Sequence, residues 1–372
     1  MVTGPYIKER LPNGLRVICE EIPYVRSVTV GFWVGAGSRF EEGTNSGISH
    51  FIEHLIFKGT STRSAKDIAE TMDSVGGQLN AFTSKEHTCF YARVLDQHFS
   101  VAIDLLSDML LRSNFDPDEI AKEKSVIVEE IKMYDDAPDE LVHDLFAQNI
   151  WAGHPLGRNI VGTAGIINSL TRDDILRYFG EHYTPDNMVV AVAGNVALAR
   201  VMEEVGRAMG GMAGKRARVD QPGPEVRPGV SLKAKDIEQV HVCLGTRGVP
   251  QDHDDMYPLY VLNNILGGGS SSRLFQEIRE DRGLAYSVYS YLSSYRDAGL
   301  FTIYAGMSPN YAEEVVDIIL RELGRMRDKG LTEDELRRAK EQMKGQLMLS
   351  LESTSNRMSR LGRSELALGR IL

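Results

Sequence analysis

Residues 45–60 carry the most regular hydrophobic pattern of the chain. Apolar side chains recur there with the i, i+3, i+4, i+7, i+8 spacing of a core-facing helix stripe, at Ile48, Phe51, Ile52, Leu55 and Ile56. Asn45 or Ser46 can cap the start of this helix, and Gly59 can end it. The pattern therefore predicts an amphipathic helix with one side in a protein core.

The other side of this helix carries three residues capable of metal chemistry. At about 100° per residue, His50, Glu53 and His54 project together. Histidines one turn apart can both reach one ion at roughly 2.0–2.1 Å, and the glutamate beside them can accept a proton from a water molecule at the metal. The order His-x-x-Glu-His inverts the more familiar His-Glu-x-x-His. Two surface histidines on an ordinary amphipathic helix are the alternative interpretation.

A second predicted helix, over 117–134, places two acids on its apolar side. That side is formed by Ile120, Val126, Ile127, Val128, Ile131 and Met133. Glu123 and Glu130, seven residues apart, project into the middle of this arc, within about 20° of each other. A buried carboxylate is costly unless it is paired or bound to a metal. The two acids predict either salt bridges to a neighbouring Arg or Lys, or the third ligand that two histidines lack for catalytic zinc.

The remaining pattern alternates short strands with helices, as in an α+β protein. Strands are predicted over 15–19, 27–34, 187–194 and 239–245, and a hairpin over 78–95 with its turn near 84–87. Further helices are predicted over 64–75, 97–112, 171–183 and 257–266, and a loop over 160–169. Residues 211–230 are rich in Gly, Pro and Arg and form the best linker. We therefore predict a first domain at 1–212, a linker at 213–228 and a second domain at 229–372.

The order of elements after the linker repeats that of the first half. Overlaying 260–269 on 50–59 keeps this order but puts Tyr260, Asn263 and Asn264 where the first half has its two histidines and glutamate. This predicts a duplication in which only the first copy carries ligands; two unrelated α+β domains are the alternative. The second half is the shorter one, so we expect a second domain truncated at its C-terminus, without a final helix and strand.

Composition narrows the function classes. Of 372 residues, 42% are hydrophobic and 25% charged, and the formal charge of −10 argues against nonspecific nucleic-acid binding. Three widely spaced cysteines, Cys19, Cys89 and Cys243, predict no disulfide framework and fit a reducing compartment. No signal peptide or apolar run of about 18 residues is present, so we expect no membrane segment and a cytoplasmic protein. A bacterial cytoplasm is favoured over the matrix of an organelle.

Together these motifs resemble one family. The segment H-F-I-E-H at 50–54, with Glu130 lying 76 positions after His54, resembles the family of pitrilysin, insulin-degrading enzyme and mitochondrial processing peptidase. Residues 76–88 look like the family's substrate-binding edge strand, and residues 278–288 look like its second-domain segment with an Arg and a Tyr seven apart. The resemblance covers essentially the whole chain and is nearest to the two-domain processing-peptidase branch.

The resemblance implies a fold and a metal site. The fold would be α+β, with two homologous domains, each an antiparallel sheet packed with helices, facing across a chamber. His50, His54 and Glu130 would bind one zinc ion per chain, and Glu53 would be the general base. Glu123 matches a family carboxylate that supports the zinc ligands through hydrogen bonds.

It also implies a substrate site. Arg279 and Tyr286 would contact the substrate backbone and the developing oxyanion. An extended peptide would add as a strand beside Asn80, Ala81, Phe82 and Thr83. A surface charge at Arg279, a core aromatic at Tyr286 and a merely structural strand are the alternatives.

We therefore expect a zinc endopeptidase that cleaves extended or unfolded peptides inside a closed chamber, as a homodimer, with no nucleic-acid or membrane partner. One alternative is a non-catalytic core or substrate-capturing subunit of the same family. Another is a structural zinc module, against which Glu53 argues, because a structural site closes with four ligands and needs no base.

Overall fold

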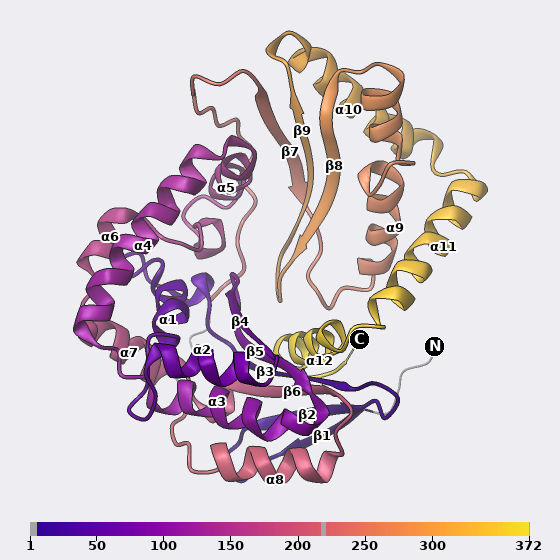
Figure 1. The fold of residues 1–372 in the computed structure, drawn as a ribbon. Coiled ribbons are helices and arrows are strands. Elements are labelled where there is room, and N and C mark those ends of the chain that lie inside the picture. Colours follow the sequence, from indigo (N-terminus) through magenta and orange to yellow (C-terminus); the bar gives the residue numbers. More distant parts are fainter. Residues whose placement is uncertain (1–5, 217–220, 372) are drawn as a thin grey trace. The chain divides into compact units, whose positions relative to one another are not determined.

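A computed structural model describes residues 6–216 and 221–371 (Figure 1). The chain divides into two compact units, each assembled from separate stretches of sequence. Unit 1 comprises residues 1–132, 158–220 and 350–372, and unit 2 comprises residues 133–157 and 221–349.

Unit 1 is built on a six-stranded sheet. Its strands are β1 (Tyr6–Arg10), β2 (Arg16–Glu21), β3 (Ser27–Val34), β4 (Gln78–Thr83), β5 (Thr88–Leu95) and β6 (Met188–Gly194). Their order is β1-β2-β6-β3-β5-β4, so β4 is an edge strand. The expected antiparallel arrangement is wrong for one pair, since β2 and β6 run parallel. A parallel pair needs a long crossover, and the chain between these two strands includes all the helices that carry the candidate ligands.

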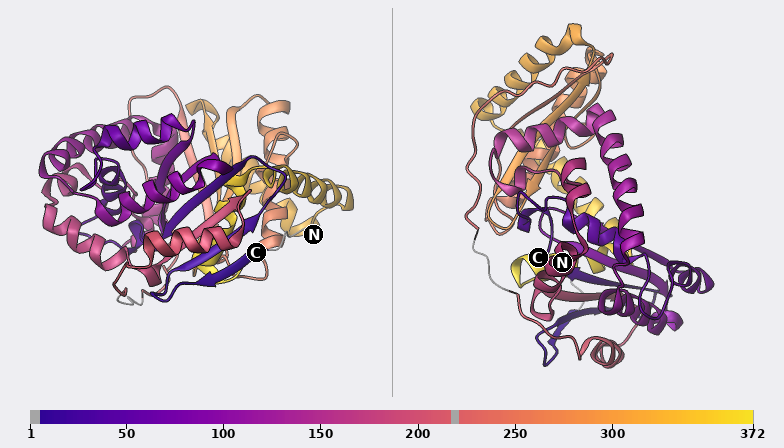
Figure 2. Two further views of the ribbon diagram at one scale, coloured as in Figure 1. Left: turned by 60° about the horizontal axis from the view of Figure 1, so that its bottom comes forward. Right: turned by 90° about the vertical axis from the view of Figure 1, so that its left-hand side faces the viewer.

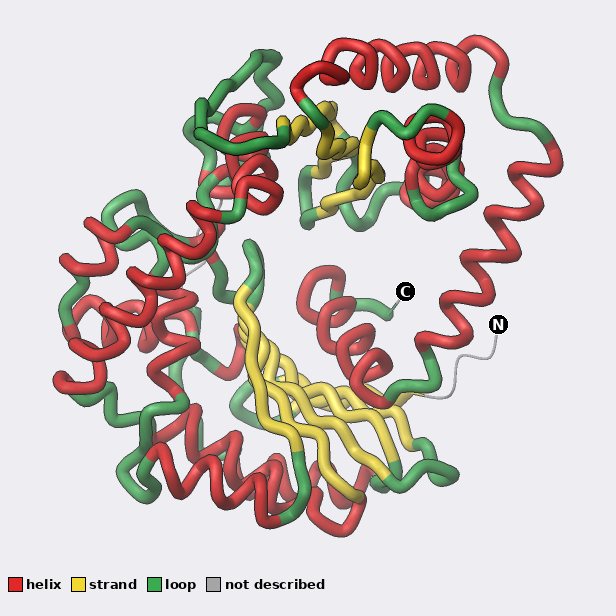
Figure 3. Tube along the Cα trace, turned by 45° about the horizontal axis from the view of Figure 1, so that its top comes forward, coloured by secondary structure: helices red, strands yellow, loops and turns green. Residues whose placement is uncertain are grey.

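Helices cover both faces of this sheet. The helices of unit 1 are α1 (Ile48–Ile56), α2 (Ala65–Ser74), α3 (Phe99–Arg112), α4 (Pro117–Asp136, whose last residues fall in unit 2), α6 (Ala164–Ser169), α7 (Arg172–His182), α8 (Leu198–Met209) and α12 (Thr354–Leu368). Figure 1 shows α2, α3 and α8 beneath the sheet and α12 above it, and Figure 3 shows α12 lying along the strands. The left view of Figure 2 shows α8, in pink, crossing the strands.

The alternation of side chains along β3 explains why both faces are covered. Val28, Val30 and Phe32 enter the main core with the apolar side of α1, whereas Trp33 enters a second core with residues of α12. A β-carbon on Gly362 of α12 would lie 2.1 Å from Nε1 of Trp33, so this close approach of helix and sheet needs a glycine.

Salt bridges fix the ends of α12 on the same face. The carboxylate of Glu365 is buried and forms ion pairs with Lys8 at 2.8 Å and with Arg16 at 3.2 Å. Arg357 pairs with the buried Glu20 of β2. Because a buried carboxylate without a partner is costly, these pairs specify where α12 docks.

Unit 2 has a smaller sheet of three antiparallel strands. Its elements are α5 (Pro138–Ile150), β7 (Val240–Arg247), α9 (Met256–Gly267), a π-helix η5 (Phe275–Asp281), β8 (Ala285–Ser294), β9 (Gly299–Met307), α10 (Ala312–Lys329) and α11 (Glu333–Ser350). The strand order is β7-β9-β8. Apolar residues of α9, η5 and α10 form the core on one face of the sheet. On the other face α5 packs against β7, where Phe146 lies against Gly245.

The topology of the two units supports the predicted duplication. In unit 1 the chain runs β3, α1, α2, β4, β5, α3, α4, and in unit 2 it runs β7, α9, η5, β8, β9, α10, α11. The corresponding strand orders, β3-β5-β4 and β7-β9-β8, are the same. The chain therefore contains two homologous α+β folds, and within the described residues the first has the extra strands β1, β2 and β6, which have no counterpart in the second.

The units differ from the expected domain boundaries in two segments. The helix after α4, which is α5, belongs to unit 2, and the helix after α11, which is α12, belongs to unit 1. We call this reciprocal placement the helix exchange. A single cut at 213–228 therefore assigns both helices to the wrong unit, because the apolar face that each one covers lies in the other half of the sequence. The described residues of that linker, 213–216 and 221–228, form neither helix nor strand, and residues 217–220 lie outside the described residues.

Most predicted elements agree with the structure to within a few residues, with two exceptions. The loop expected at 160–169 contains the short helix α6. In α4, Val126 and Met133 are 48% and 62% exposed, so the apolar side is narrower than predicted. Among the described helices, none is long and apolar enough to cross a membrane.

Candidate metal centre

The start of α1 is fixed by a residue outside the helix. Gly47, the N-cap, adopts a φ of +95° and has no side chain to cap with. Instead the buried carboxylate of Glu41 accepts hydrogen bonds from the backbone N–H groups of Gly47 at 2.7 Å and Ser49 at 2.9 Å. Capping by Asn45 or Ser46 was therefore the wrong expectation, because the left-handed turn at Gly47 lets a more distant acid reach the helix terminus, where negative charge is favourable.

The rest of α1 follows the predicted pattern. Its apolar stripe is fully buried, at Ile48, Phe51, Ile52, Leu55 and Ile56. The helix ends at Ile56, and Gly59 has a φ of +119°, the left-handed region that a terminating glycine supplies. Since the stripe fixes the rotation of the helix, it also fixes the direction of the side carrying His50, Glu53 and His54.

His50 and His54 of α1 converge with Glu130 of α4. Nε2 of His50 lies 3.7 Å from Oε1 of Glu130, and Nε2 of His54 lies 3.7 Å from Oε2 of the same carboxylate. One donor atom from each residue lies within 4.8 Å of the others, and in the described part of the chain this is the one such group of three that could hold a metal ion. Ligands at 2.0–2.1 Å in a tetrahedron lie roughly 3.3 Å apart, so the three donors are close to the spacing of a zinc site.

The electrostatics of the three donors suit a cation. Burial, and to a smaller degree the neighbouring His54, lower the pKa of His50 to about 4. At neutral pH its imidazole is therefore uncharged and has a free lone pair, as a metal ligand requires. Burial raises the pKa of Glu130, opposed by its attraction to His54. Two imidazoles and one carboxylate form the donor set of a catalytic zinc site, which keeps a fourth position open.

Glu123 lies behind His54 and is almost fully buried. One of its oxygens, Oε2, is 3.0 Å from Nδ1 of His54, and the other, Oε1, is 2.5 Å from Nζ of Lys58. Glu123 therefore makes both contacts considered from sequence, an ion pair with a lysine and a hydrogen bond with the candidate ligand His54. Lys58 follows His54 by four residues, one further helical turn, but a lysine at the end of an amphipathic helix is not by itself a signal of a metal centre. By contrast, Nδ1 of His50 is buried with no hydrogen-bond partner among the described residues.

Glu53 lies beside the three donors without belonging to their group. It is half-buried, and its Oε2 accepts a hydrogen bond of 2.6 Å from the hydroxyl of Thr83 on β4. Burial raises the pKa of Glu53, while the hydrogen bond from Thr83 opposes this change. A carboxylate whose pKa is raised, lying beside a candidate metal site, is suited to accept and return a proton.

The residues predicted to bind substrate occupy two places. Asn80, Ala81, Phe82 and Thr83 lie on β4, the edge strand, which pairs with β5 on one side only. In unit 2, Arg279 lies on η5 with its guanidinium carbon 4.9 Å from the centre of the Tyr286 ring, and Tyr286 is 77% exposed at the start of β8. The Arg and Tyr are thus neighbours on the surface of their unit, and their contact with substrate stays a prediction.

Family comparisons match both halves of the chain. Residues 16–164 match the family described as insulinase (peptidase family M16), and residues 169–343 match the family described as peptidase M16 inactive domain. The second description agrees with the replacement of the motif residues by Tyr260, Asn263 and Asn264 in the second copy.

Individual relatives span nearly the whole chain. The uncharacterized zinc protease YmxG of Bacillus subtilis is 49% identical over 358 residues, covering 96% of this chain and 87% of the relative. An uncharacterized zinc protease of Streptomyces coelicolor is 45% identical, covering 98% of this chain and 82% of the relative. Among solved structures, a protease from Helicobacter pylori aligns with a TM-score of 0.92 at 25% identity, covering 98% of this chain and 90% of that chain.

Proposed function

We propose that this chain, which belongs to the insulinase family of peptidases (family M16), hydrolyses peptide bonds with one zinc ion held by His50, His54 and Glu130. The observation that carries the proposal is the convergence of these three donors beside a fourth residue, Glu53, that is not one of them. The relatives named as zinc proteases support the choice of zinc over another divalent ion.

Each residue of the centre has a chemical task in this proposal. Zinc, when bound, would polarise the substrate carbonyl and lower the pKa of water. Glu53 takes the proton of the attacking water and later delivers it to the leaving amine, for which its raised pKa is suited. Glu123 accepts a hydrogen bond from the Nδ1–H group of His54, which would leave the Nε2 lone pair for the metal.

We propose that the substrate is an extended peptide, cut at internal bonds. The free edge of β4 can pair with such a peptide as an added strand, next to Thr83, which already contacts Glu53. Arg279 and Tyr286 would contact the substrate backbone and the oxyanion that forms on the attacked carbonyl. Enclosure of the peptide in a chamber belongs to the same proposal.

The main alternative is a non-catalytic subunit of the same family. A subunit that only captures substrate has no use for a complete set of ligands, base and Arg–Tyr pair in one chain. A structural zinc site is the other alternative, and it would leave Glu53 without a task. The full set favours a self-sufficient enzyme, which we propose to be a homodimer. We also propose a reducing cytoplasm as its location, because Cys19, Cys89 and Cys243 are widely spaced and odd in number.

Bound metal and cleavage measured on one preparation test this proposal. We expect about one zinc per chain and cleavage of an unstructured peptide at internal bonds, abolished by a chelator and restored by zinc. The variant Glu53→Gln should keep its zinc and lose cleavage, because the amide cannot accept the proton. Near-normal turnover by Glu53→Gln would contradict the assignment of the base. Full zinc occupancy in an unchanged protein that cleaves no peptide would favour the non-catalytic alternative.

A further inference from the structure

We infer that Lys58 is a positioning residue of the metal centre, holding Glu123 so that Glu123 in turn orients His54. This inference rests on the proposed zinc site. The observation behind it is that the buried carboxylate of Glu123 joins the two side chains, with Nζ of Lys58 at 2.5 Å from Oε1 and Nδ1 of His54 at 3.0 Å from Oε2.

The side chains involved form a ladder between two segments. His50, His54 and Lys58 recur every four residues along α1 and the turn that ends it, whereas Glu130 and Glu123 are two turns apart on α4. The contacts alternate between the two segments. Glu130 contacts both His50 and His54, His54 also contacts Glu123, and Glu123 also contacts Lys58. Lys58 is the terminal group of this series and its one permanent cation.

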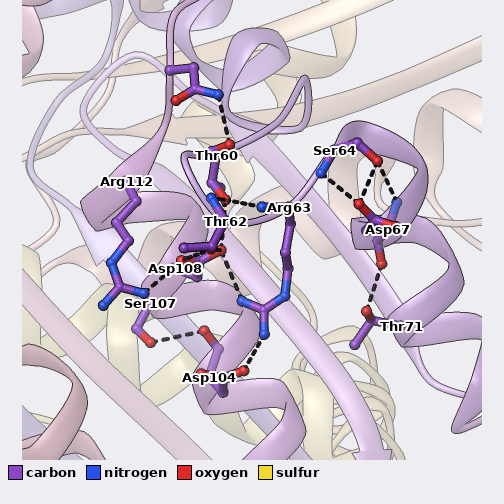
Figure 4. Close-up of polar contacts among 11 residues, drawn as sticks. Thr60, Thr62, Arg63, Ser64, Asp67, Thr71, Asp104, Ser107, Asp108 and Arg112 are labelled. Carbon is purple, nitrogen blue, oxygen red and sulfur yellow. Dashed lines mark hydrogen bonds and ion pairs between the residues drawn. The ribbon is translucent and has the colours of Figure 1, made fainter.

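The backbone that carries Lys58 is itself anchored. Its N–H donates to the carbonyl of Leu55 at 3.0 Å, closing the last turn of α1. The segment that follows is tied to α3 by the network in Figure 4, where Thr60 and Arg63 both contact the buried carboxylate of Asp108, at 2.8 and 2.9 Å. The ammonium therefore extends from a fixed position, although its side chain is 32% exposed.

The energetic consequence concerns Glu123. Its side chain is 6% exposed, and Lys58 and His54 are its two ionic partners. A buried carboxylate that loses its cation is strongly disfavoured, so without Lys58 the side chain of Glu123 would move away from its buried position. That movement weakens the hydrogen bond that holds the His54 ring. Residues that orient metal ligands typically affect metal affinity by about 10–100-fold.

The test measures zinc affinity of the full chain freed of metal, by competition with a chromophoric chelator. We expect Lys58→Met to weaken zinc binding by about tenfold, the lower end of that range, because it acts through Glu123. Lys58→Arg should bind zinc nearly as well as the unchanged protein. The matched control is Lys8→Met. Lys8 also pairs with a buried carboxylate of unit 1, that of Glu365 on α12, at 2.8 Å. Loss of this lysine should leave the zinc affinity unchanged. Thermal unfolding of the metal-free proteins reports whether each variant folds.

A double-mutant cycle with Glu123→Gln separates positioning from a general effect. In the Glu123→Gln background there is no buried carboxylate for Lys58 to pair with, so Lys58→Met should cause no further loss of zinc affinity. The double variant is therefore informative even if the single variant Lys58→Met unfolds. Three results would each overturn the inference. Lys58→Met could bind zinc as tightly as the wild-type protein, Lys8→Met could lose as much zinc affinity as Lys58→Met, or Lys58→Met could cause the same loss in the Glu123→Gln background. An unchanged protein that binds no zinc would overturn the proposed function itself.

Discussion

The hydroxyl of Thr83 donates a hydrogen bond of 2.6 Å to Oε2 of Glu53, which joins the edge strand β4 to the acid of the His-x-x-Glu-His motif. The bond leaves Oε1 of Glu53 for other chemistry and opposes the rise in pKa that burial causes. A substrate strand added to β4 would therefore lie next to the residue that fixes the direction of the proposed base.

Thr83→Val should slow cleavage without releasing zinc. The substitution keeps the shape of the side chain but removes a hydrogen bond to a charged group, whose loss costs about 1.5–3 kcal/mol, so kcat should fall by about tenfold or more. Steady-state kinetics with parallel zinc analysis check this, and Thr83→Ser, which retains the hydroxyl, should recover most of the rate. Normal kcat in the valine variant would mean that Glu53 is oriented by other groups.

Glu130→Gln should lose most of its zinc. An amide is a much weaker ligand than a carboxylate, and the two histidines alone do not complete a catalytic zinc site. The adjacent Glu129 is exposed and pairs with Lys132 at 2.6 Å on the surface of α4, so Glu129→Gln serves as the matched control. Metal analysis after dialysis distinguishes the two variants. Equal zinc content in both would refute the assignment of Glu130 as third ligand.

Tyr286→Phe should lower kcat by about 10²–10³-fold with zinc content unchanged, as for the loss of one oxyanion donor. The ring and its contact with Arg279 stay in place, so the effect reports the phenolic hydroxyl. Tyr311→Phe, a 42% exposed tyrosine elsewhere in unit 2, is the control and should keep full activity. If the two phenylalanine variants were equally active, Tyr286 would have no part in the chemistry.

Gly362→Ala should destabilise unit 1 by about 1–3 kcal/mol, the usual cost of overpacking. The new methyl group would meet the indole of Trp33 at 2.1 Å. Gly345 lies in α11 with nothing within 4 Å of an added β-carbon, so Gly345→Ala should instead stabilise its helix by roughly 0.5–1 kcal/mol. Denaturant unfolding of both variants checks the opposite signs, and destabilisation by both would point to helix flexibility rather than to the contact with Trp33.

Glu335→Gln should reduce stability at neutral pH but not in strong acid. Hydrogen bonds from Arg273, with smaller contributions from Thr332, lower the pKa of Glu335 to about 2. Because this pKa lies below the unfolded value of about 4.3, the ionised carboxylate stabilises the fold above pH ~4.3, by about 1–2 kcal/mol with solvent screening of the pair, and this contribution disappears as the pH falls toward 2.

Thermal unfolding at pH 7 and at pH 3 checks this dependence. The difference between the unchanged protein and Glu335→Gln should be smaller at pH 3. The neighbouring Glu333 lies exposed in the same first turn of α11, and Glu333→Gln should change little at either pH. A gap that widens in acid would contradict the sign of the pKa change.

Local periodicity was sufficient to predict which faces of α1 and α4 carry the candidate ligands, whereas the choice of Glu130 over Glu123 as third ligand came from the family resemblance. The apolar stripe of α1 and the two acids on the apolar side of α4 depend on spacing within one helix, which sequence records directly. The convergence of His50, His54 and Glu130 agrees with that expectation. The hairpin of β4 and β5 was predicted for the same reason, since strand alternation and turn residues are local signals.

Contacts between segments far apart in the sequence could not be predicted from the local hydrophobic pattern. Glu41 caps α1 from the preceding loop, and nothing in its spacing distinguishes it from Glu42 beside it. The parallel pairing of β2 with β6 depends on elements separated by most of the unit. The helix exchange was also missed, because α5 and α12 have ordinary amphipathic sequences that do not reveal which sheet they cover.

The helix exchange bears on how the protein is made. Residues 354–368 leave the ribosome after the rest of unit 1 has been synthesised. Trp33 and the face of β3 around it therefore stay uncovered by α12 while unit 2 is synthesised. At synthesis rates of about 5–20 residues per second this delay lasts on the order of ten seconds or more. During that time the nascent chain exposes an apolar, aggregation-prone surface. Chaperone dependence and poor yield of a fragment ending at the linker are its natural consequences.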